Sequence, residues 1–483
     1  MAVLAIDQGT SATKASVVDD EGRVLASASA DVEVRNGPGD AVEVDPEALW
    51  QSVLRAGRDA CASAGHPALA AVGLANQGET IVAWDRRTGE PIGPAIVWQD
   101  GRAAVVCDEL RPHAERLAQL TGLTLDPYFV APKITWLRRQ AGPGPTITTT
   151  DTWLVHRLCS AFVTDAATAS RSLVLDLDQV GWSDEACALF EIEPDDLPTV
   201  VDNAGVVGET TAFAGATGRR GGSRAVPVAG LCVDQQAALF AQACLGPGDA
   251  KCTYGTGAFL LATTAAPTRS THGLVGCVAW RLGGAPTWCL DGQVFTVGSV
   301  VKWLLSIGVI TEPGDLDALG GSVPDGGGVH FVPALAGLGA PFWSPSARGA
   351  LTGLSLGTER AHVVRAVIEG IAANVACLAR AAGDDLGRPL TRLRVDGGLT
   401  RSRTLLQVQA DLMQVPVEVY PSPDATAMGV AAFARLGVGL AATAAEAVGG
   451  RTASMVVEPA IGADDAAERL ASWRAAADAT IPR

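Results

Sequence analysis

Two short loops rich in glycine and threonine carry the residues of this sequence that are best suited to bind an anion. The first is DQGTS at 7–11, after an apolar run at 3–6, and the second is TYGTG at 253–257, before an apolar run at 258–261. Each pattern predicts a strand, a tight turn and a second strand. Glycine lets backbone N–H groups approach a ligand, threonine and serine add hydroxyl donors, and a concave row of N–H groups binds phosphate. One such loop in each half predicts two related domains that close on one nucleotide.

Two aspartates at predicted strand ends could supply the charge that phosphoryl transfer needs. Asp7 ends the run at 3–6 and could orient Mg²⁺ through water, although a turn-forming aspartate explains it equally well. Asp234 follows a strand predicted at 225–231 and precedes a helix predicted at 237–243. It could act as general base toward a substrate hydroxyl, but from the residues alone a helix N-cap is the simpler interpretation.

Other residues could shape the ligand pockets. Trp98 and Tyr128 could form walls of a sugar pocket, and Glu79 in a polar loop could accept a hydroxyl. Core packing and a solvated carboxylate are the ordinary alternatives. The pair Gly397-Gly398, between a strand predicted at 393–395 and a helix predicted at 402–412, could admit a flat adenine base, or could be a common turn.

Several familiar site chemistries are absent from the sequence. There is no G-x-x-x-x-G-K-[ST] phosphate loop, no third glycine for a dinucleotide fingerprint, no H-E-x-x-H zinc motif and no G-x-S-x-G nucleophile elbow. Acidic residues beside glycine turns remain. They fit transfer of a phosphoryl group from a magnesium-bound nucleotide, which needs positioned phosphates, a carboxylate on the metal side and a base.

The composition predicts a globular α/β protein. The 483 residues suffice for two or three domains, and the breaker Gly246-Pro247-Gly248 sets our predicted boundary between residues 1–245 and 246–483. A helix is expected to start at Asp45 and Pro46 and to end at Gly65, and another covers 361–381.

The net charge and the cysteine pattern indicate which partners and which compartment suit this protein. A net charge of −16 argues against nucleic acid, and no segment approaches the roughly 20 uninterrupted apolar residues of a membrane helix. The ten cysteines lack CxxC pairs, so reduced thiols in a cytoplasmic protein are predicted. We expect a homo-oligomer, a dimer or a tetramer.

Together these residues resemble the FGGY carbohydrate kinases, and among them the glycerol kinases most closely. The resemblance covers nearly the whole chain. Its segments are IDQGT at 6–10, AIVWQ at 95–99, DPYF at 126–129, DQQAALF at 234–240, TYGTG at 253–257 and the stretch from 337 to 369. It implies two ribonuclease-H-like domains of the actin and sugar-kinase type, with ATP in the cleft between them.

The resemblance also implies a role for each matching residue. Asp234 would be the catalytic base, with Gln235 beside it, and Asp7 would serve the metal, to which Asp234 also lies close. The residues implied to contact the nucleotide are Thr10, Ser11, Lys14, Thr256, Gly298, Lys302, Gly398 and Ser402. Those implied to form the acceptor pocket are Glu79, Trp98, Tyr128, Asp234, Gln235 and Phe259.

One departure from the family concerns the acceptor. Glycerol kinases have a hydroxyl-binding arginine where this chain has Gly78, beside Glu79. Losing a charged hydrogen bond costs roughly 1.5–3 kcal/mol. We therefore expect a larger polyol or sugar, with four or five carbons, to fill the space. A second feature, the basic loop at 221–224, resembles a fructose-bisphosphate regulatory loop of some glycerol kinases, and a plain surface loop is the simpler account.

The sequence thus predicts an ATP- and Mg²⁺-dependent kinase of a primary hydroxyl on a small polyol or sugar. A ketopentose kinase for xylulose or ribulose is the alternative within the family. Gly78 favours that alternative, and the Trp98 and Tyr128 segments disfavour it. Two other classes are an actin-like ATPase without an acceptor and a degenerate kinase that only senses sugar. The complete set of Asp7, Asp234 and Thr256 argues against the sensor.

Overall fold

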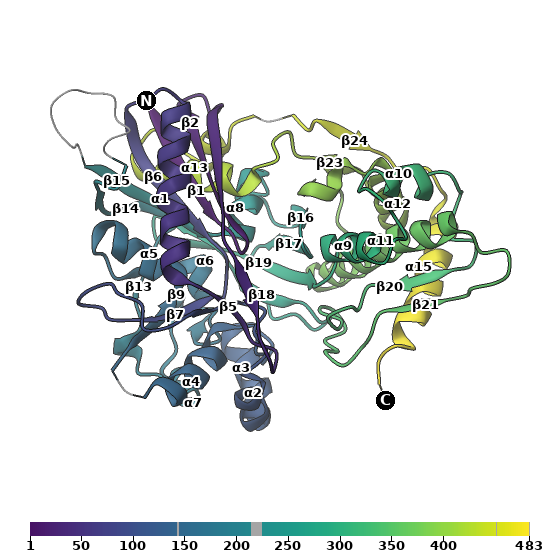
Figure 1. The fold of residues 1–483 in the computed structure, drawn as a ribbon, viewed down its shortest axis with the longest axis horizontal. Coiled ribbons are helices and arrows are strands. Elements are labelled where there is room, and N and C mark those ends of the chain that lie inside the picture. Colours follow the sequence, from purple (N-terminus) through teal and green to yellow (C-terminus); the bar gives the residue numbers. More distant parts are fainter. Residues whose placement is uncertain (143, 214–224, 451, 483) are drawn as a thin grey trace.

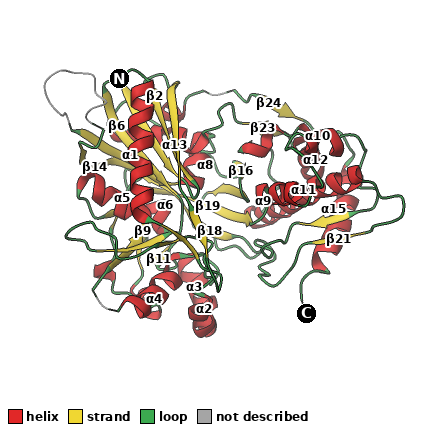
Figure 2. Cartoon of the chain, viewed as in Figure 1, coloured by secondary structure: helices red, strands yellow, loops and turns green. Residues whose placement is uncertain are grey.

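Two twisted sheets, one in each half of the chain, organise the fold, as Figures 1 and 2 show. The structure is a computed structural model, and it describes residues 1–142, 144–213, 225–450 and 452–482. The predicted loop at 215–224, with its segment 221–224, lies outside the described residues.

The first sheet has six strands. In spatial order they are β14 (Ala204–Thr210), β15 (Val226–Val233), β6 (Leu69–Asn76), β1 (Ala2–Gln8), β2 (Ala12–Asp19) and β3 (Val24–Asp31). The meander from β1 to β3 is antiparallel, whereas β1, β6 and β15 run parallel and β14 closes the far edge antiparallel. The predicted hairpin at the start of the chain is confirmed.

The second sheet repeats this pattern and adds one strand. In spatial order it contains β18 (Val275–Leu282), β19 (Ala285–Val294), β17 (Ala258–Thr264), β16 (Ala250–Tyr254), β22 (Leu393–Asp396), β23 (Val417–Val419) and β24 (Met455–Val457). From β19 to β24 the pairings are antiparallel, antiparallel, parallel, parallel and antiparallel, which is the succession from β3 to β14. This duplication is the predicted pair of ribonuclease-H-like sheets.

Smaller sheets accompany the two main ones. A third sheet in the first half orders β4 (Val34–Asn36), β5 (Val42–Val44), β8 (Ala95–Ile96), β7 (Ile81–Trp84) and β9 (Thr146–Thr149). The two-stranded pairs are β10 (Val163–Asp165) with β13 (Thr199–Val201), β11 (Leu175–Asp176) with β12 (Gly181–Trp182), and β20 (His330–Val332) with β21 (Ala350–Thr352).

The helices pack around these sheets. Those of the first half are α1 (Pro46–Ser63), α2 (Ala104–Leu110), α3 (Ala114–Thr121), α4 (Val130–Ala141), α5 (Thr150–Cys159), α6 (Ala166–Ala169), α7 (Asp184–Leu189) and α8 (Asp234–Ala241). Those of the second half are α9 (Gly298–Ser306), α10 (Asp315–Gly320), α11 (Arg360–Leu386), α12 (Arg403–Met413), α13 (Ala425–Gly437), α14 (Ala444–Val448) and α15 (Ala463–Asp478).

The first helix forms as its sequence predicts. The side chain of Asp45 accepts a hydrogen bond from the backbone N–H of Glu47, Pro46 takes the first helical position, and Gly65 has a positive φ of 73° just beyond the end. Such a cap satisfies a backbone donor that the helix leaves free.

The two faces of β1 pack against different helices. Side chains of successive strand residues point to opposite faces. Leu4 and Ile6 therefore join the cluster that contains Leu49 and Val53 of α1, while Val3 and Ala5 join the cluster that contains residues of α8 and α13.

Helix α13 comes from late in the chain but covers the first sheet, as Figure 1 shows. Glycines allow this close approach. A Cβ on Gly73 of β6 would lie 2.7 Å from the Val430 carbonyl oxygen, and one on Gly230 of β15 would lie 2.5 Å from the Ala434 nitrogen. The sheet and the helix therefore touch backbone to backbone.

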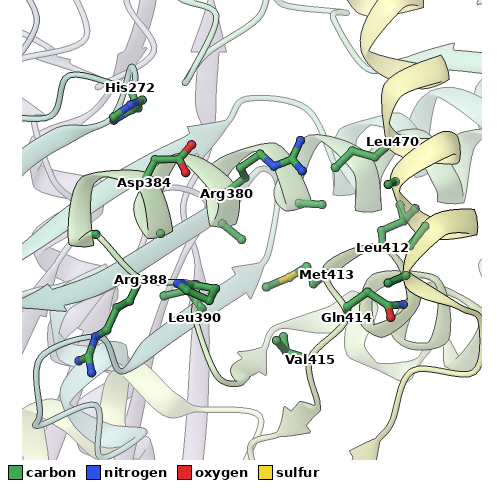
Figure 3. Close-up of a pocket in the computed structure, with 18 residues that line it drawn as sticks. His272, Arg380, Asp384, Arg388, Leu390, Leu412, Met413, Gln414, Val415 and Leu470 are labelled. Carbon is green, nitrogen blue, oxygen red and sulfur yellow. The ribbon is translucent and has the colours of Figure 1, made fainter.

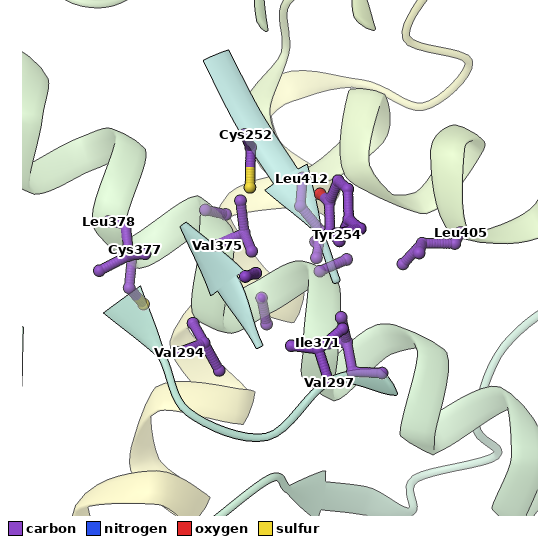
Figure 4. Close-up of a cluster of buried hydrophobic side chains, with 14 of the residues drawn as sticks. Cys252, Tyr254, Val294, Val297, Ile371, Val375, Cys377, Leu378, Leu405 and Leu412 are labelled. Carbon is purple, nitrogen blue, oxygen red and sulfur yellow. The ribbon is translucent and has the colours of Figure 1, made fainter. Parts of the chain in front are cut away.

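The core of the second half lies between its sheet and α11. Figure 4 shows Cys252 and Tyr254 of β16 and Val294 of β19 among side chains from the helix, such as Ile371 and Val375. The helix runs five residues beyond the predicted end at 381. Its length and a mean hydropathy of 1.4 would suit a membrane span, but 72% of that stretch is buried inside the protein, so α11 is a core helix.

All ten cysteines are free thiols, and nine of them are buried. This agrees with the prediction of reduced cysteines.

Candidate active site

The two glycine loops meet at one cavity. It has a volume of about 160 Å³ and is lined from both halves of the molecule. The predicted site residues around it are Thr10, Glu79, Trp98, Tyr128, Asp234, Gln235, Thr256 and Phe259. The whole predicted acceptor pocket therefore lies together with one threonine from each loop.

Asp234 is placed at the start of α8, where β15 ends. The N-cap position belongs to Val233 and no side-chain cap is present, so the ordinary capping role does not explain the aspartate. Burial, followed by the like charges of Asp7 and Glu79, raises the pKa of Asp234 to about 7, against the opposing charge of Lys251. A carboxylate of this pKa is suited to take a proton near neutral pH.

Asp7 is the penultimate residue of β1, beside the first loop. Burial raises the pKa of Asp7 to about 6, Lys14 opposes the shift, and the charges of Asp424 and Asp396 add to it. Lys14 stands across the hairpin from Asp7 and makes a 3.5 Å ion pair with Asp424. Because Asp7 and Asp234 each feel neighbouring carboxylates, this side of the cleft has a surplus of negative charge that a cation would relieve.

Three aromatic rings form one wall of the cavity. The ring of Trp98 lies 5.6 Å from that of Tyr128 and 6.4 Å from that of Phe259, both edge-on. The indole N–H of Trp98 donates to the hydroxyl of Thr10 at 2.9 Å, which ties the wall to the first glycine loop. Such a wall can contact the carbon skeleton of a polyol while leaving its hydroxyls to the polar residues.

The second loop packs tightly against the start of α9. The N–H of Gly255 donates to the carbonyl of Gly257 at 2.9 Å, and the N–H of Gly298 donates to the carbonyl of Gly255 at 3.0 Å. A Cβ on Gly257 would come within 2.4 Å of the Val294 carbonyl oxygen, so this position needs glycine. The packing leaves Thr256 exposed at the tip and places Lys302 one turn into the helix.

The predicted adenine region lies beyond β22. Gly397 has a φ of 96°, whereas a Cβ on Gly398 would meet no atom within 4 Å, so Gly398 borders open space. Ser402 caps α12: its hydroxyl accepts from the N–H of Leu405 at 3.1 Å and donates to Asp317 at 2.7 Å. The predicted residues that do not line the 160 Å³ cavity are Asp7, Ser11, Lys14, Gly298, Lys302, Gly398 and Ser402. Their contacts with a nucleotide stay predictions.

Comparisons with known proteins agree with this geometry. Family models of the FGGY carbohydrate kinases match residues 2–241 (N-terminal domain) and 250–437 (C-terminal domain). This chain belongs to the FGGY family of carbohydrate kinases. It is therefore a phosphotransferase with an alcohol group as acceptor.

Relatives of this FGGY kinase include a glycerol kinase from Alkalilimnicola ehrlichii, which is 42% identical over 98% of this chain and 97% of its own. Among solved structures, Plasmodium falciparum glycerol kinase with ADP has a TM-score of 0.91 and 29% identity, and covers 100% of this chain and 98% of its own. Xylulose kinase from Rhodospirillum rubrum has a TM-score of 0.86 and 26% identity, and covers 99% of each chain.

Two residues of this FGGY kinase that no motif indicated lie at the floor of the cavity. Arg171 follows α6, and its Nε donates to Glu79 at 2.6 Å while its Nη1 lies 2.8 Å from Asp291 of β19. Glu79 and Asp291 hold the pKa of Arg171 well above its usual value although burial opposes them. The arginine thus links the acceptor pocket to the second sheet.

Lys251 is a third residue that the sequence motifs missed. It is fully buried in β16, and its Nζ donates to Gln235 at 2.6 Å and to the hydroxyl of Thr253 at 2.8 Å. A lysine inside a short buried strand was the available signal, because such a charge is rarely buried without partners. Lys251 connects Gln235, the neighbour of Asp234, with the second glycine loop.

A larger cavity of about 700 Å³ lies elsewhere, between the end of α11 and α15. Figure 3 shows Arg380, Asp384 and Leu470 around it. It contains no predicted site residue and no residue from either glycine loop.

Proposed function

We propose that this protein transfers the γ-phosphate of ATP to a primary hydroxyl of a small polyol or sugar. The observation that carries the proposal is the position of Asp234, in one cavity with the acceptor residues Glu79 and Trp98 and with Thr256 of the second glycine loop. A base, an acceptor pocket and a phosphate-binding turn are what phosphoryl transfer to an alcohol needs.

The proposed reaction assigns a proton and a bond to each participant. Asp234 takes the proton of the acceptor hydroxyl, and the oxygen forms a bond to the γ-phosphorus as the bond to the bridging β,γ-oxygen breaks. Both glycine loops present N–H groups and hydroxyls, such as those of Thr10 and Thr256, to the phosphates. The aromatic wall keeps water from the γ-phosphate, which would otherwise be hydrolysed.

The cleft fits a magnesium ion carried by the nucleotide. Mg²⁺ is usually held by one or two carboxylates together with water and phosphate oxygens. Asp7 and Asp234 are the residues proposed to hold it, and the charge of Asp7 raises the pKa of Asp234. When bound, the ion neutralises charge on the phosphates.

The nucleotide is proposed to extend from the glycine loops to the open space at Gly398. Lys14 and Ser11 would contact phosphates from the first half, and Gly298 and Lys302 from the second. Ser402 would act beside the adenine through its place at the start of α12.

The acceptor is proposed to be a polyol such as the glycerol named for its relatives, or a longer one. The ketopentose alternative draws on the xylulose kinase likeness, which is the more distant. We further propose a cytoplasmic protein, where ATP is available and free thiols stay reduced, an oligomer of two or four copies, and a division into domains at 245 and 246.

The test is release of ADP with ATP, Mg²⁺ and a panel of glycerol, tetritols, pentitols, xylulose and ribulose. Acceptor-dependent release that Asp234→Asn abolishes supports the proposal. Asp384→Asn, an exposed aspartate at the distant cavity, is the matched control and should behave as wild type. ATP hydrolysis that needs no acceptor and survives Asp234→Asn would favour the actin-like class instead.

A further inference from the structure

A buried ionic network joins the two halves beneath the acceptor pocket. Arg171 lies between Glu79, contributed by the first half, and Asp291, contributed by the second, at 2.6 and 2.8 Å. The side chains of all three are at most 4% exposed, and all three residues line the 160 Å³ cavity. The network therefore forms the floor of the acceptor pocket.

Several polar atoms at this floor have no partner in the described part of the chain. Nη2 of Arg171 donates no hydrogen bond to a described residue, because the hydrogen bonds of its guanidinium are made by Nε and Nη1. Oδ1 of Asp291 and Nε2 of Gln77 are buried and likewise unpartnered among the described residues. Buried polar atoms are nearly always hydrogen-bonded, so two free buried ones on residues that line one cavity, Asp291 Oδ1 and Gln77 Nε2, indicate a polar ligand.

The free atoms are complementary to a hydroxyl group. A hydroxyl can donate one hydrogen bond and accept others. Asp291 Oδ1 can accept its proton, while Arg171 Nη2 and Gln77 Nε2 can donate to its oxygen. Oε1 of Glu79 already accepts from Arg171, whereas its Oε2 accepts no hydrogen bond from a described residue. Glu79 therefore has one oxygen left for a hydroxyl nearer to Asp234.

The wall at Gly78 is apolar. A Cβ on Gly78 would lie 3.0 Å from Cγ2 of Val233, and both residues line the cavity. A side chain at 78 would press on this methyl group, so this wall offers hydrocarbon contact and backbone only. Gly78 has no side chain that could bind a hydroxyl. The side chains of Arg171 and Asp291, at the floor of the cavity, can do so instead.

We propose that Arg171, Asp291 and Gln77 form a second hydroxyl subsite, and that the acceptor is a straight-chain polyol of four or five carbons whose distal hydroxyl occupies it. This inference rests on the proposed kinase activity. The hydroxyl at Asp234 is phosphorylated, the next one binds Glu79, and the additional carbon passes the Gly78 and Val233 wall so that its hydroxyl reaches the floor.

The first arm of the test compares acceptors on the wild-type protein. We expect kcat/KM for erythritol, threitol or a pentitol to exceed that for glycerol by about 10- to 100-fold, the value of one charged hydrogen bond. Glycerol as the best acceptor overturns the second subsite and leaves the proposed function standing. If no member of the panel releases ADP, the proposed function itself fails.

The second arm exchanges single atoms of the subsite. Gln77→Glu replaces the free donor with an oxygen and keeps the Oε1 that accepts from Thr80 at 3.1 Å. Asp291→Asn keeps one oxygen for Arg171. Each variant should lower kcat/KM for the longer polyol about tenfold more than for glycerol, mainly through KM, and an equal loss for both acceptors overturns the assignment.

The matched control for Arg171→Lys is Arg281→Lys. Arg281 also crosses between the halves, with a 2.6 Å ion pair to Asp202, but it does not line the cavity. We expect Arg171→Lys to change the ratio of the two acceptors and Arg281→Lys to leave it at the wild-type value. Should Arg171→Lys not fold, the ratio of kcat/KM for the longer polyol to that for glycerol in Gln77→Glu and Asp291→Asn tests the subsite instead.

Discussion

The two halves share one strand order but differ in the charge they bring to the cleft. In the first sheet β1 has Asp7 as its penultimate residue and β15 leads to Asp234. In the second sheet the corresponding strand β16 brings Thr253, and Asp396 at the end of β22 accepts a hydrogen bond from Gln242. The fold is duplicated, whereas the two aspartates proposed to act on the hydroxyl and the metal, Asp7 and Asp234, come from the first half.

This asymmetry suits a reaction with two different partners. In the proposed reaction the first half activates the alcohol, which needs a base, while both halves hold the anionic phosphates, and a carboxylate in the second glycine loop would repel them. The strand register shows this difference directly. Asp7 pairs with Lys14 in the first hairpin, whereas at the corresponding place in the second hairpin Thr253 pairs with Phe259. Duplicated folds can thus specialise by a few substitutions at strand ends.

The largest effect is expected from removing the base. Asp234→Asn keeps the shape of the side chain but cannot take a proton at neutral pH, so kcat should fall by about 10²- to 10⁴-fold. Steady-state ADP release measures this. A fall of less than tenfold would contradict a division in which the first half activates the acceptor.

The two glycine loops should differ in how well they tolerate alanine. A Cβ at Gly257 would be 2.4 Å from a carbonyl oxygen, whereas one at Gly9 would be 3.1 Å from the carbonyl oxygen of Ala12. Gly257→Ala should lower the free energy of unfolding by about 1–3 kcal/mol, and Gly9→Ala by less. Urea unfolding measures the difference. Gly181→Ala, with no atom within 4 Å of its added Cβ, is the control.

The pH dependence of kcat/KM should follow the titration of Asp234, which belongs to the first half. The proposed base Asp234 would act when deprotonated and its pKa is about 7, so kcat/KM of the free enzyme should fall tenfold per pH unit below 7 and level off above it. Lys251 lowers the pKa of Asp234, so Lys251→Met should move this limb to higher pH. A limb that stays in place would show that Lys251 acts on geometry alone.

The smallest effect on stability is expected at Lys14. Its ion pair with Asp424 is partly exposed, with side-chain exposures of 52% and 21%, and such pairs are worth about 0–1 kcal/mol. Lys14→Ala should therefore leave the unfolding midpoint nearly unchanged while raising KM for ATP. An unchanged KM for ATP would show that Lys14 does not contact the phosphates beside the first loop.

Local patterns sufficed for much of the fold. The hairpin at the start of the chain, the capped helix α1 and the periodic helix α11 all follow from residues close together in sequence. Asp7 and Asp234 could be found because Asp7 lies near the end of a strand beside a glycine turn and Asp234 follows a strand at a helix start, although the residues alone left turn and cap explanations open.

The floor of the site could not be found in this way. Arg171 lies 92 positions from Glu79 and belongs to no glycine turn or strand end, so only the tertiary packing reveals its role. Asp291 reaches the cavity from the seventh position of the ten-residue strand β19, which carries no motif. Ser402 shows the converse: a residue implied by resemblance for the nucleotide has its hydroxyl engaged in capping α12.

The return of α13 to the first sheet has a consequence for anyone who divides this protein. A fragment that stops at residue 245 would lose the helix that covers Val3, Ala5 and Ala71, and would expose that apolar face to water. The first sheet is completed by a segment made almost 180 residues later. The helices that pack on the first sheet are therefore not all contiguous with it in sequence. Split or truncated versions of the protein should carry α13 and α14 with the first half, for example on a linker.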